Sequence, residues 1–254
     1  MSSSIPKLMH AVLLTSHGGM DKLEYRSDVN VPVPKEDEVL INVKGAGINN
    51  TDINTRIGWY SKSSVENADD GSWSGNPLNF PIIQGADICG NIVAVGSSVD
   101  KKRIGERVIV RTMQTVPNNK KNFSAWTVGS ECNGGFAQYA SIRSSEAFII
   151  NSNWTDIEIA SIPCAYSTAE GLLHRAQVVK EKILITGASG GVGSAAIQLA
   201  KLRGATVIAQ CASEKKNEVK KIGADQIVFR DTNLIKELGE SSVDVVIDLV
   251  AGSN

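Results

Sequence analysis

Short apolar runs, broken by glycine, proline and charged residues, dominate the first part of the chain. Within the stretch from residue 10 to 47, apolar side chains alternate with polar ones at Val39, Ile41 and Val43, which is typical of a half-buried β-strand. A second series of such runs extends over residues 91–110 and has glycines at its turns. The pattern predicts a small barrel-like β domain.

The pattern changes near Asn151. Residues 155–178 have helical character with a turn around Pro163, and short β-branched runs then alternate with helical segments. Four strands are predicted, at 183–186, 206–209, 226–229 and 243–250. We therefore expect an α/β fold with a β-barrel domain at 1–150 and a doubly wound parallel sheet at 151–254. That sheet is incomplete, because a full one has six strands in two halves.

The sequence KILITGASGGVGSAAIQLAK, residues 182–201, predicts a strand, a tight turn and a helix. Glycines permit positive φ angles and a close approach of the backbone to a ligand, and the N–H groups of a helix N-terminus attract an anion. A pyrophosphate fits such a site; the alternative is a turn that is merely tight. The predicted cofactor contacts are Gly187, Ser189, Gly190, Gly191, Val192 and Gly193.

Composition narrows the function classes. The chain has 254 residues and a formal net charge of −1, with its lysine pairs interspersed by acidic residues, so nucleic acid is not expected as a partner. We find no apolar run of membrane-spanning length and no signal peptide, and the four cysteines are widely spaced. These features predict a cytoplasmic protein that is not associated with a membrane.

Several motifs occur in a characteristic order: GINNTDINTRIGWY (47–60), PIIQGADICGNIVAVG (81–96), IGERV (104–108), GGFAQYA (134–140) and STAEGL (167–172), followed by the glycine loop. Together they resemble the medium-chain dehydrogenase/reductase superfamily, most closely its zinc-free, quinone-oxidoreductase-like branch. The resemblance implies a GroES-like catalytic domain, a Rossmann domain, and reduction by a nicotinamide cofactor bound between them.

The resemblance also bears on the end of the chain. Similar proteins continue into a second half of the Rossmann sheet after the AGSN that ends this sequence, so the chain is expected to be truncated. That second half supplies the edge strand through which many relatives dimerise. A homodimer is therefore expected for a full-length parent and not for this chain.

Zinc-dependent members of the superfamily carry a Cys where this chain has Asn49, a His-Glu pair where it has Ala86 and Asp87, and a Cys or His that matches Cys164. A catalytic zinc needs three protein ligands. We therefore predict no metal. Cys164 is either a small buried apolar residue or a substrate contact.

Cofactor choice depends on the end of the second strand of the sheet, where NAD-specific proteins place an acidic residue. Here Ser213 follows that strand, with Lys215 and Lys216 after it, and a hydroxyl and two cations suit a 2′-phosphate, whereas Glu214 between them opposes one. In similar reductases a lysine binds this phosphate; Lys215 matches it best, and Arg230 is a second candidate. The prediction is NADPH rather than NADH, although Ser213 could instead be a helix N-cap and the lysine a solvated charge.

Without zinc, catalysis needs an oriented cofactor and a proton donor. Tyr60 matches a tyrosine near the active site of similar reductases, and Thr168 matches a position near the nicotinamide. Asn49 could hydrogen-bond a substrate carbonyl, whereas Asp52 is expected to stabilise the turn. The alternative for Tyr60 is a packing role.

Two polar stretches, 61–79 and 112–131, carry aromatic residues that either wall a substrate pocket or anchor surface loops. The predicted partner is a small electrophile, and three functions stay open. They are an NADPH-dependent reductase of quinones, enones or related carbonyls, a zinc-free alcohol dehydrogenase, and a fragment that binds NADPH without turnover.

Overall fold

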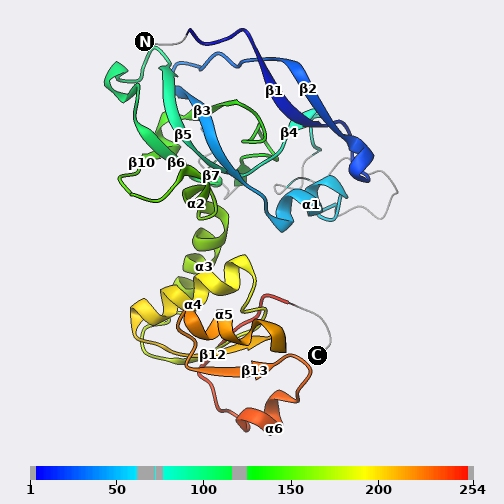
Figure 1. Cartoon of the computed structure of the whole chain (residues 1–254), viewed down its shortest axis with the longest axis vertical. Coiled ribbons are helices and arrows are strands. Elements are labelled where there is room, and N and C mark those ends of the chain that lie inside the picture. The colour runs from blue at the N-terminus through cyan, green and yellow to red at the C-terminus, as the bar shows by residue number, and fades with distance from the viewer. Residues whose placement is uncertain (1–3, 62–71, 73–76, 116–124, 251–254) are drawn as a thin grey trace. The chain divides into compact units, whose positions relative to one another are not determined.

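The computed structural model describes residues 4–61, 72, 77–115 and 125–250, which form two compact units, residues 1–163 and 164–254 (Figure 1). The elements of the first unit are β1 (Leu8–Leu14), η1 (Met20–Lys22), β2 (Leu23–Asn30), β3 (Glu38–Gly47), α1 (Asn50–Arg56), β4 (Ile82–Ile83), β5 (Asp87–Val95), η2 (Lys101–Arg103), β6 (Arg107–Val110), β7 (Met113–Thr115), β8 (Ala125–Thr127), β9 (Tyr139–Arg143), η3 (Ser144–Glu146), β10 (Ala147–Ile149) and α2 (Asp156–Ala160).

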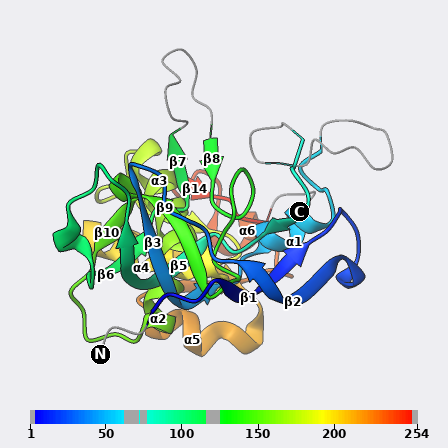
Figure 2. The ribbon, with the colours of Figure 1, turned by 90° about the horizontal axis from the view of Figure 1, so that it is seen from above.

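The first unit is built from antiparallel sheets, as its alternating pattern predicts. Its largest sheet has the order β10-β6-β5-β3-β9, and a second has the order β2-β1-β4. The predicted alternation in β3 is confirmed in part: Val39 and Ile41 are fully buried in the core, and Val43 packs at its border. The short pair β7 and β8 stands side by side in Figure 2.

Helix α2 belongs to the first unit, so the division between the units falls after Pro163, later than the boundary that we predicted near Asn151. The reason is close packing of α2 on β3. A Cβ built at Gly45 would lie 2.5 Å from the backbone oxygen of Asp156, and one at Gly47 would lie 2.4 Å from that of Ala160. Only glycine permits this approach, which a sequence pattern does not reveal.

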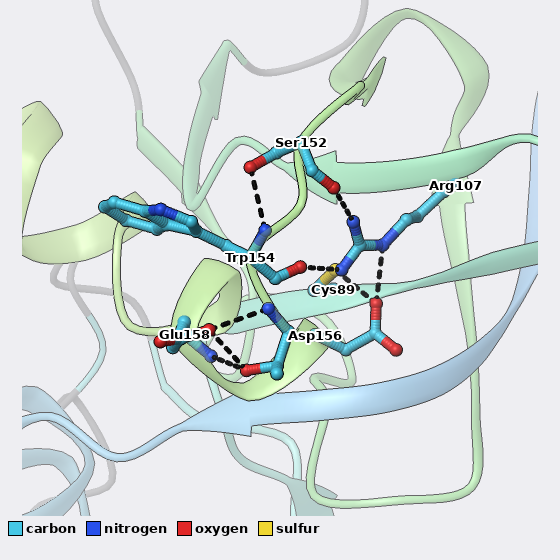
Figure 3. A network of polar contacts seen from close by, with 7 residues as sticks. Cys89, Arg107, Ser152, Trp154, Asp156 and Glu158 are labelled. Carbon is cyan, nitrogen blue, oxygen red and sulfur yellow. Dashed lines mark hydrogen bonds and ion pairs between the residues drawn. The ribbon is translucent and has the colours of Figure 1, made fainter.

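Arg107 secures the segment that leads into α2 (Figure 3). Its guanidinium donates to Asp156 Oδ1 at 2.7 Å and to the backbone oxygens of Ser152 and Trp154 at 2.8 and 2.6 Å. The Cys89 thiol donates to the same Asp156 oxygen at 3.5 Å. Burial, followed by this contact with Asp156, raises the pKa of Cys89 to about 12, so the thiol stays protonated and acts as a donor.

The second unit contains the four predicted strands. Its elements are α3 (Pro163–Arg175), which begins at the unit boundary, β11 (Lys182–Ile185), α4 (Gly191–Arg203), β12 (Thr206–Cys211), η4 (Ser213–Lys215), α5 (Lys216–Lys221), β13 (Gln226–Phe229), α6 (Leu234–Leu238) and β14 (Val245–Ile247). The strands are parallel in the order β13-β12-β11-β14.

Both faces of this parallel sheet are covered, which explains why its strands are continuous apolar runs. Figure 1 shows α4 and α5 on one side and α6 on the other. In β11, Ile183 and Ile185 face one core, while Leu184 packs with Leu234 and Leu238 of α6 in the other. Strand order reverses at β11, because the chain goes outward through β12 and β13 and then returns to β14. Ligands of such sheets bind at this reversal.

Candidate active site

The glycine loop joins β11 to α4 at the point where the strand order reverses. Gly187 has φ +57°, a left-handed conformation that favours glycine. A Cβ built at Gly193 would lie 2.4 Å from the Gly187 oxygen and 2.7 Å from the Ala188 Cα. These two glycines therefore let the turn pack directly against the first turn of α4.

The outer side of the loop is open. Ser189, Gly190 and Gly191 are exposed, and a Cβ built at Gly191 would meet only Ala165 at 3.7 Å. Helix α4 begins at Gly191, so the N–H groups of its first residues, Val192 included, have no partner within the helix. With the positive end of a 13-residue helix behind them, these donors fit a pyrophosphate.

The residues predicted to bind the 2′-phosphate lie at the carboxyl end of β12. Ser213 and Lys215 are the first and last residues of η4, and Ala212 is its N-cap, so the alternative of Ser213 as an N-cap is wrong. Arg230 comes to the same edge, because its backbone N–H donates to the oxygen of Cys211 at 3.2 Å. The Lys215 ammonium contacts Glu218 at 3.2 Å, and both side chains are largely exposed.

Helix α3 begins beside the glycine loop, since Ala165 is the nearest neighbour of Gly191 outside that loop. Thr168 follows three residues later, on the same helical face as Ala165, and is exposed. Cys164 is half-buried at the start of this helix. The structure thus places Thr168 on the helix that adjoins the glycine loop.

In the first unit, Asn49 is the N-cap of α1 and forms a capping box with Asp52. The Asn49 N–H donates to Asp52 Oδ2 at 2.8 Å, and the Gly85 N–H donates to Oδ1 at 3.2 Å. Gln84 donates to the Asp52 backbone oxygen at 2.9 Å. The predicted role of Asp52 in stabilising the turn is confirmed by these contacts. Burial raises the pKa of its carboxyl to about 6, and nearby Asp87 adds to this effect.

Asp87 joins Asn49 in a buried polar cluster that sequence reasoning missed. Asp87 is 1% exposed; its Oδ2 accepts from Asn49 Nδ2 at 3.0 Å, and its Oδ1 accepts from the Thr112 hydroxyl at 3.0 Å. In the sequence, only one feature pointed to Asp87: together with Ala86 it matches the His-Glu pair of the zinc-dependent members of the superfamily. Thr112 had no comparable signal, because only the sheet brings it beside β5.

Tyr60 follows α1 and is half-buried. Asn54 Nδ2 donates to its hydroxyl at 3.4 Å, and the ring packs edge-on against Trp59 at 5.3 Å. Helix α1, which precedes Tyr60, also contacts His17: the His17 Nδ1 forms a hydrogen bond with the Thr55 backbone oxygen at 2.8 Å. Most of the two aromatic stretches predicted as pocket walls, including Trp73 and Phe123, lies outside the described residues.

Within the described ranges, no three His, Cys, Asp or Glu side chains gather as a metal site would require. Of the positions that match zinc ligands in relatives, Asn49 and Asp87 are hydrogen-bonded to each other, and Ala86 has no ligating group. No helix of the described parts is long and apolar enough to span a bilayer.

Comparison with known proteins identifies the family. The sequence model of the alcohol dehydrogenase GroES-like domain matches residues 35–152, and that of the zinc-binding dehydrogenase family matches residues 191–254. Human quinone oxidoreductase is 32% identical over 256 residues, which cover 98% of this chain and 68% of that enzyme. The chain belongs to the medium-chain dehydrogenase/reductase superfamily.

Other medium-chain relatives agree. The chloroplastic NADPH-dependent alkenal/one oxidoreductase of Arabidopsis thaliana is 32% identical, with 98% of this chain and 59% of that protein covered. The crystal structure of a putative alcohol dehydrogenase from Sinorhizobium meliloti has 42% identity and a TM-score of 0.88, covering 98% of this chain and 71% of that one. The predicted GroES-like and Rossmann-type domains, and the quinone-oxidoreductase-like branch, are confirmed. The chain is of the oxidoreductase type and spans about two thirds of these relatives.

Proposed function

We propose that this chain carries the reductase site of a zinc-free, NADPH-dependent enzyme that acts on a quinone, an enone or a related carbonyl compound. The observation that carries the proposal is the Asn49–Asp87 hydrogen bond, which occupies positions where zinc-dependent relatives hold metal ligands. The glycine loop and the open N-terminus of α4 supply the matching cofactor site.

The donor set argues against zinc at this position. Zinc in catalytic sites takes three ligands from Cys, His and carboxylate side chains. An amide at Asn49 and a methyl at Ala86 do not serve, and both Asp87 oxygens accept hydrogen bonds from neighbouring side chains. The relatives named quinone oxidoreductase and alkenal/one oxidoreductase support a carbonyl or quinone substrate.

The preference for NADPH is argued from charge at the end of β12. No acidic side chain lies within β12 itself, and Ser213, Lys215 and Arg230 lie at the same edge of the sheet. Glu214 lies between the first two and accepts from the Ser213 hydroxyl at 3.3 Å, so it opposes this preference in part. A 2′-phosphate would gain charge-assisted hydrogen bonds from these groups. The name of the Arabidopsis relative includes NADPH, which supports the same choice.

When bound, the nicotinamide supplies the hydride. The residues of this chain have three tasks. The N–H groups at the start of α4 bind the pyrophosphate, Asn49 donates an N–H toward the substrate carbonyl oxygen, and Tyr60 holds a proton for the oxygen that becomes negative. A positioned donor of this kind typically contributes a factor of about 10²–10³ to the rate.

The test is a titration of the purified chain with NADPH and NADH, followed by nucleotide fluorescence, and then NADPH oxidation with a panel of quinones and enones. We expect tighter NADPH binding and turnover of at least one electrophile. Lys215→Ala should weaken NADPH binding and leave NADH binding unchanged, with Lys221→Ala, at the exposed far end of α5, as the matched control. Tighter NADH binding would refute the cofactor assignment, and NADPH binding without turnover would leave a nucleotide-binding fragment.

A second candidate is a zinc-free alcohol dehydrogenase. The putative alcohol dehydrogenase from Sinorhizobium meliloti, at 42% identity, favours it. The two functions differ in the reaction: the reductase would reduce a quinone or an enone with NADPH, whereas the dehydrogenase would interconvert an alcohol and its carbonyl compound. NADP-dependent oxidation of members of an alcohol panel, with no reduction of the carbon–carbon double bond of an enone, would select the dehydrogenase.

A further inference from the structure

The Asn49 amide is constrained from two directions. Its nitrogen donates to Asp87 Oδ2 at 3.0 Å, and its backbone is held at the start of α1, where its N–H donates to Asp52 Oδ2 at 2.8 Å and its carbonyl oxygen accepts from the Asp52 N–H at 3.0 Å. An amide nitrogen carries two hydrogens. One of these hydrogens is donated to Asp87. Among the described residues, the second N–H of Asn49 has no hydrogen-bond acceptor.

Asp87 decides which end of the amide faces it. Both Asp87 oxygens accept hydrogen bonds here, from Asn49 Nδ2 and from the Thr112 hydroxyl, so turning the Asn49 oxygen toward Asp87 Oδ2 would set two acceptors against each other. Thr112 donates to the other carboxylate oxygen at 3.0 Å and therefore holds the plane of that group. Asp87 and Thr112 are 1% and 8% exposed, so water does not compete freely for these contacts.

We propose that Asp87, held by Thr112, is a positioning residue that orients the Asn49 amide so that its second N–H donates to the substrate carbonyl oxygen. This inference rests on the proposed function. With an enone or a simple carbonyl compound, a hydride supplied by bound NADPH would add to the electrophilic carbon, and the π electron pair would shift to the carbonyl oxygen. Asn49 stabilises that negative charge without losing its proton, and the proton that completes the reduction comes from the Tyr60 hydroxyl or from water.

A double-mutant cycle separates positioning from a structural role. Asn49→Ser removes the amide donor but keeps a good N-cap for α1, so kcat should fall about 10²-fold with the thermal midpoint nearly unchanged. Asp87→Leu should lower kcat about tenfold. If Asp87 acts through Asn49, adding Asp87→Leu to Asn49→Ser should change kcat less than about twofold. Losses that multiply in the double variant would overturn the inference.

A milder variant covers the case in which Asp87→Leu fails to fold. Thr112→Val removes only the hydroxyl that holds the carboxylate, and we expect a smaller loss of kcat that also vanishes in the Asn49→Ser background. The Kd for NADPH should stay within about twofold throughout, because Asn49 is remote in sequence from the glycine loop and binds no part of the dinucleotide in this proposal. An equal fall in NADPH affinity would point to a general disturbance and refute the positioning role.

Nuclear magnetic resonance tests the orientation without turnover. The side-chain amide signal that disappears in Asn49→Ser belongs to Asn49, and one of its protons should exchange with solvent more slowly in the wild type than in Thr112→Val or Asp87→Leu. Equal exchange rates would overturn the inference. If the wild type reduces no electrophile, the proposed function fails, and the exchange rates still decide whether Asp87 orients Asn49.

Discussion

Replacing Gly193 by alanine tests how the glycine loop is built. A Cβ at this position would lie 2.4, 2.7 and 2.9 Å from three backbone atoms of Gly187 and Ala188, and none of them belongs to a flexible side chain. The loop would have to move away from α4. Overpacking of this kind costs about 1–3 kcal/mol, and the better helix propensity of alanine offsets up to about 1 kcal/mol.

The net expectation for Gly193→Ala is a loss of about 1–2 kcal/mol of unfolding free energy, or roughly 2–8 °C in thermal midpoint for a chain of this size. NADPH binding, followed by fluorescence titration, should weaken at least tenfold, because the loop donors shift with the turn. Gly191→Ala is the matched control. Its Cβ would meet only Ala165 at 3.7 Å, so the thermal midpoint should not fall. A Gly193→Ala variant with wild-type midpoint and affinity would refute this account.

Two further predictions concern the first unit. Arg107→Leu removes the contacts to Asp156 and two backbone oxygens, so the thermal midpoint should fall further than in Arg107→Lys, which keeps the charge; equal midpoints for Arg107→Leu and wild type would contradict this role. The pKa of Asp52 rises from 3.8 to about 6 on folding, so the folded state binds the proton more tightly. Stability should therefore decline as pH rises from about 4 to 6, by up to about 3 kcal/mol relative to Asp52→Asn, which does not titrate there. Parallel pH profiles of the urea midpoints would show that burial of Asp52 has no such effect.

Local patterns predicted much of the fold because they report local physics. The continuous apolar runs at 183–186, 206–209 and 226–229 form a buried parallel sheet, and glycine spacing located the turn between β11 and α4. Helix α2 lies in the first compact unit, although in sequence it looks like the start of the next domain. Its packing on Gly45 and Gly47 of β3 depends on contacts more than a hundred residues apart.

The sequence by itself determined the family, the position of the glycine loop and the choice of Asn49 and Tyr60 as candidate residues, since each lies in a contiguous motif. Only the tertiary structure decided what Asn49 contacts. Asp87 is 38 residues away from it, and Thr112 a further 25, and the pairing of β3, β5 and β6 brings these strands together. A hydrogen bond requires atoms about 3 Å apart, and that proximity is a property of the folded sheet rather than of any local pattern.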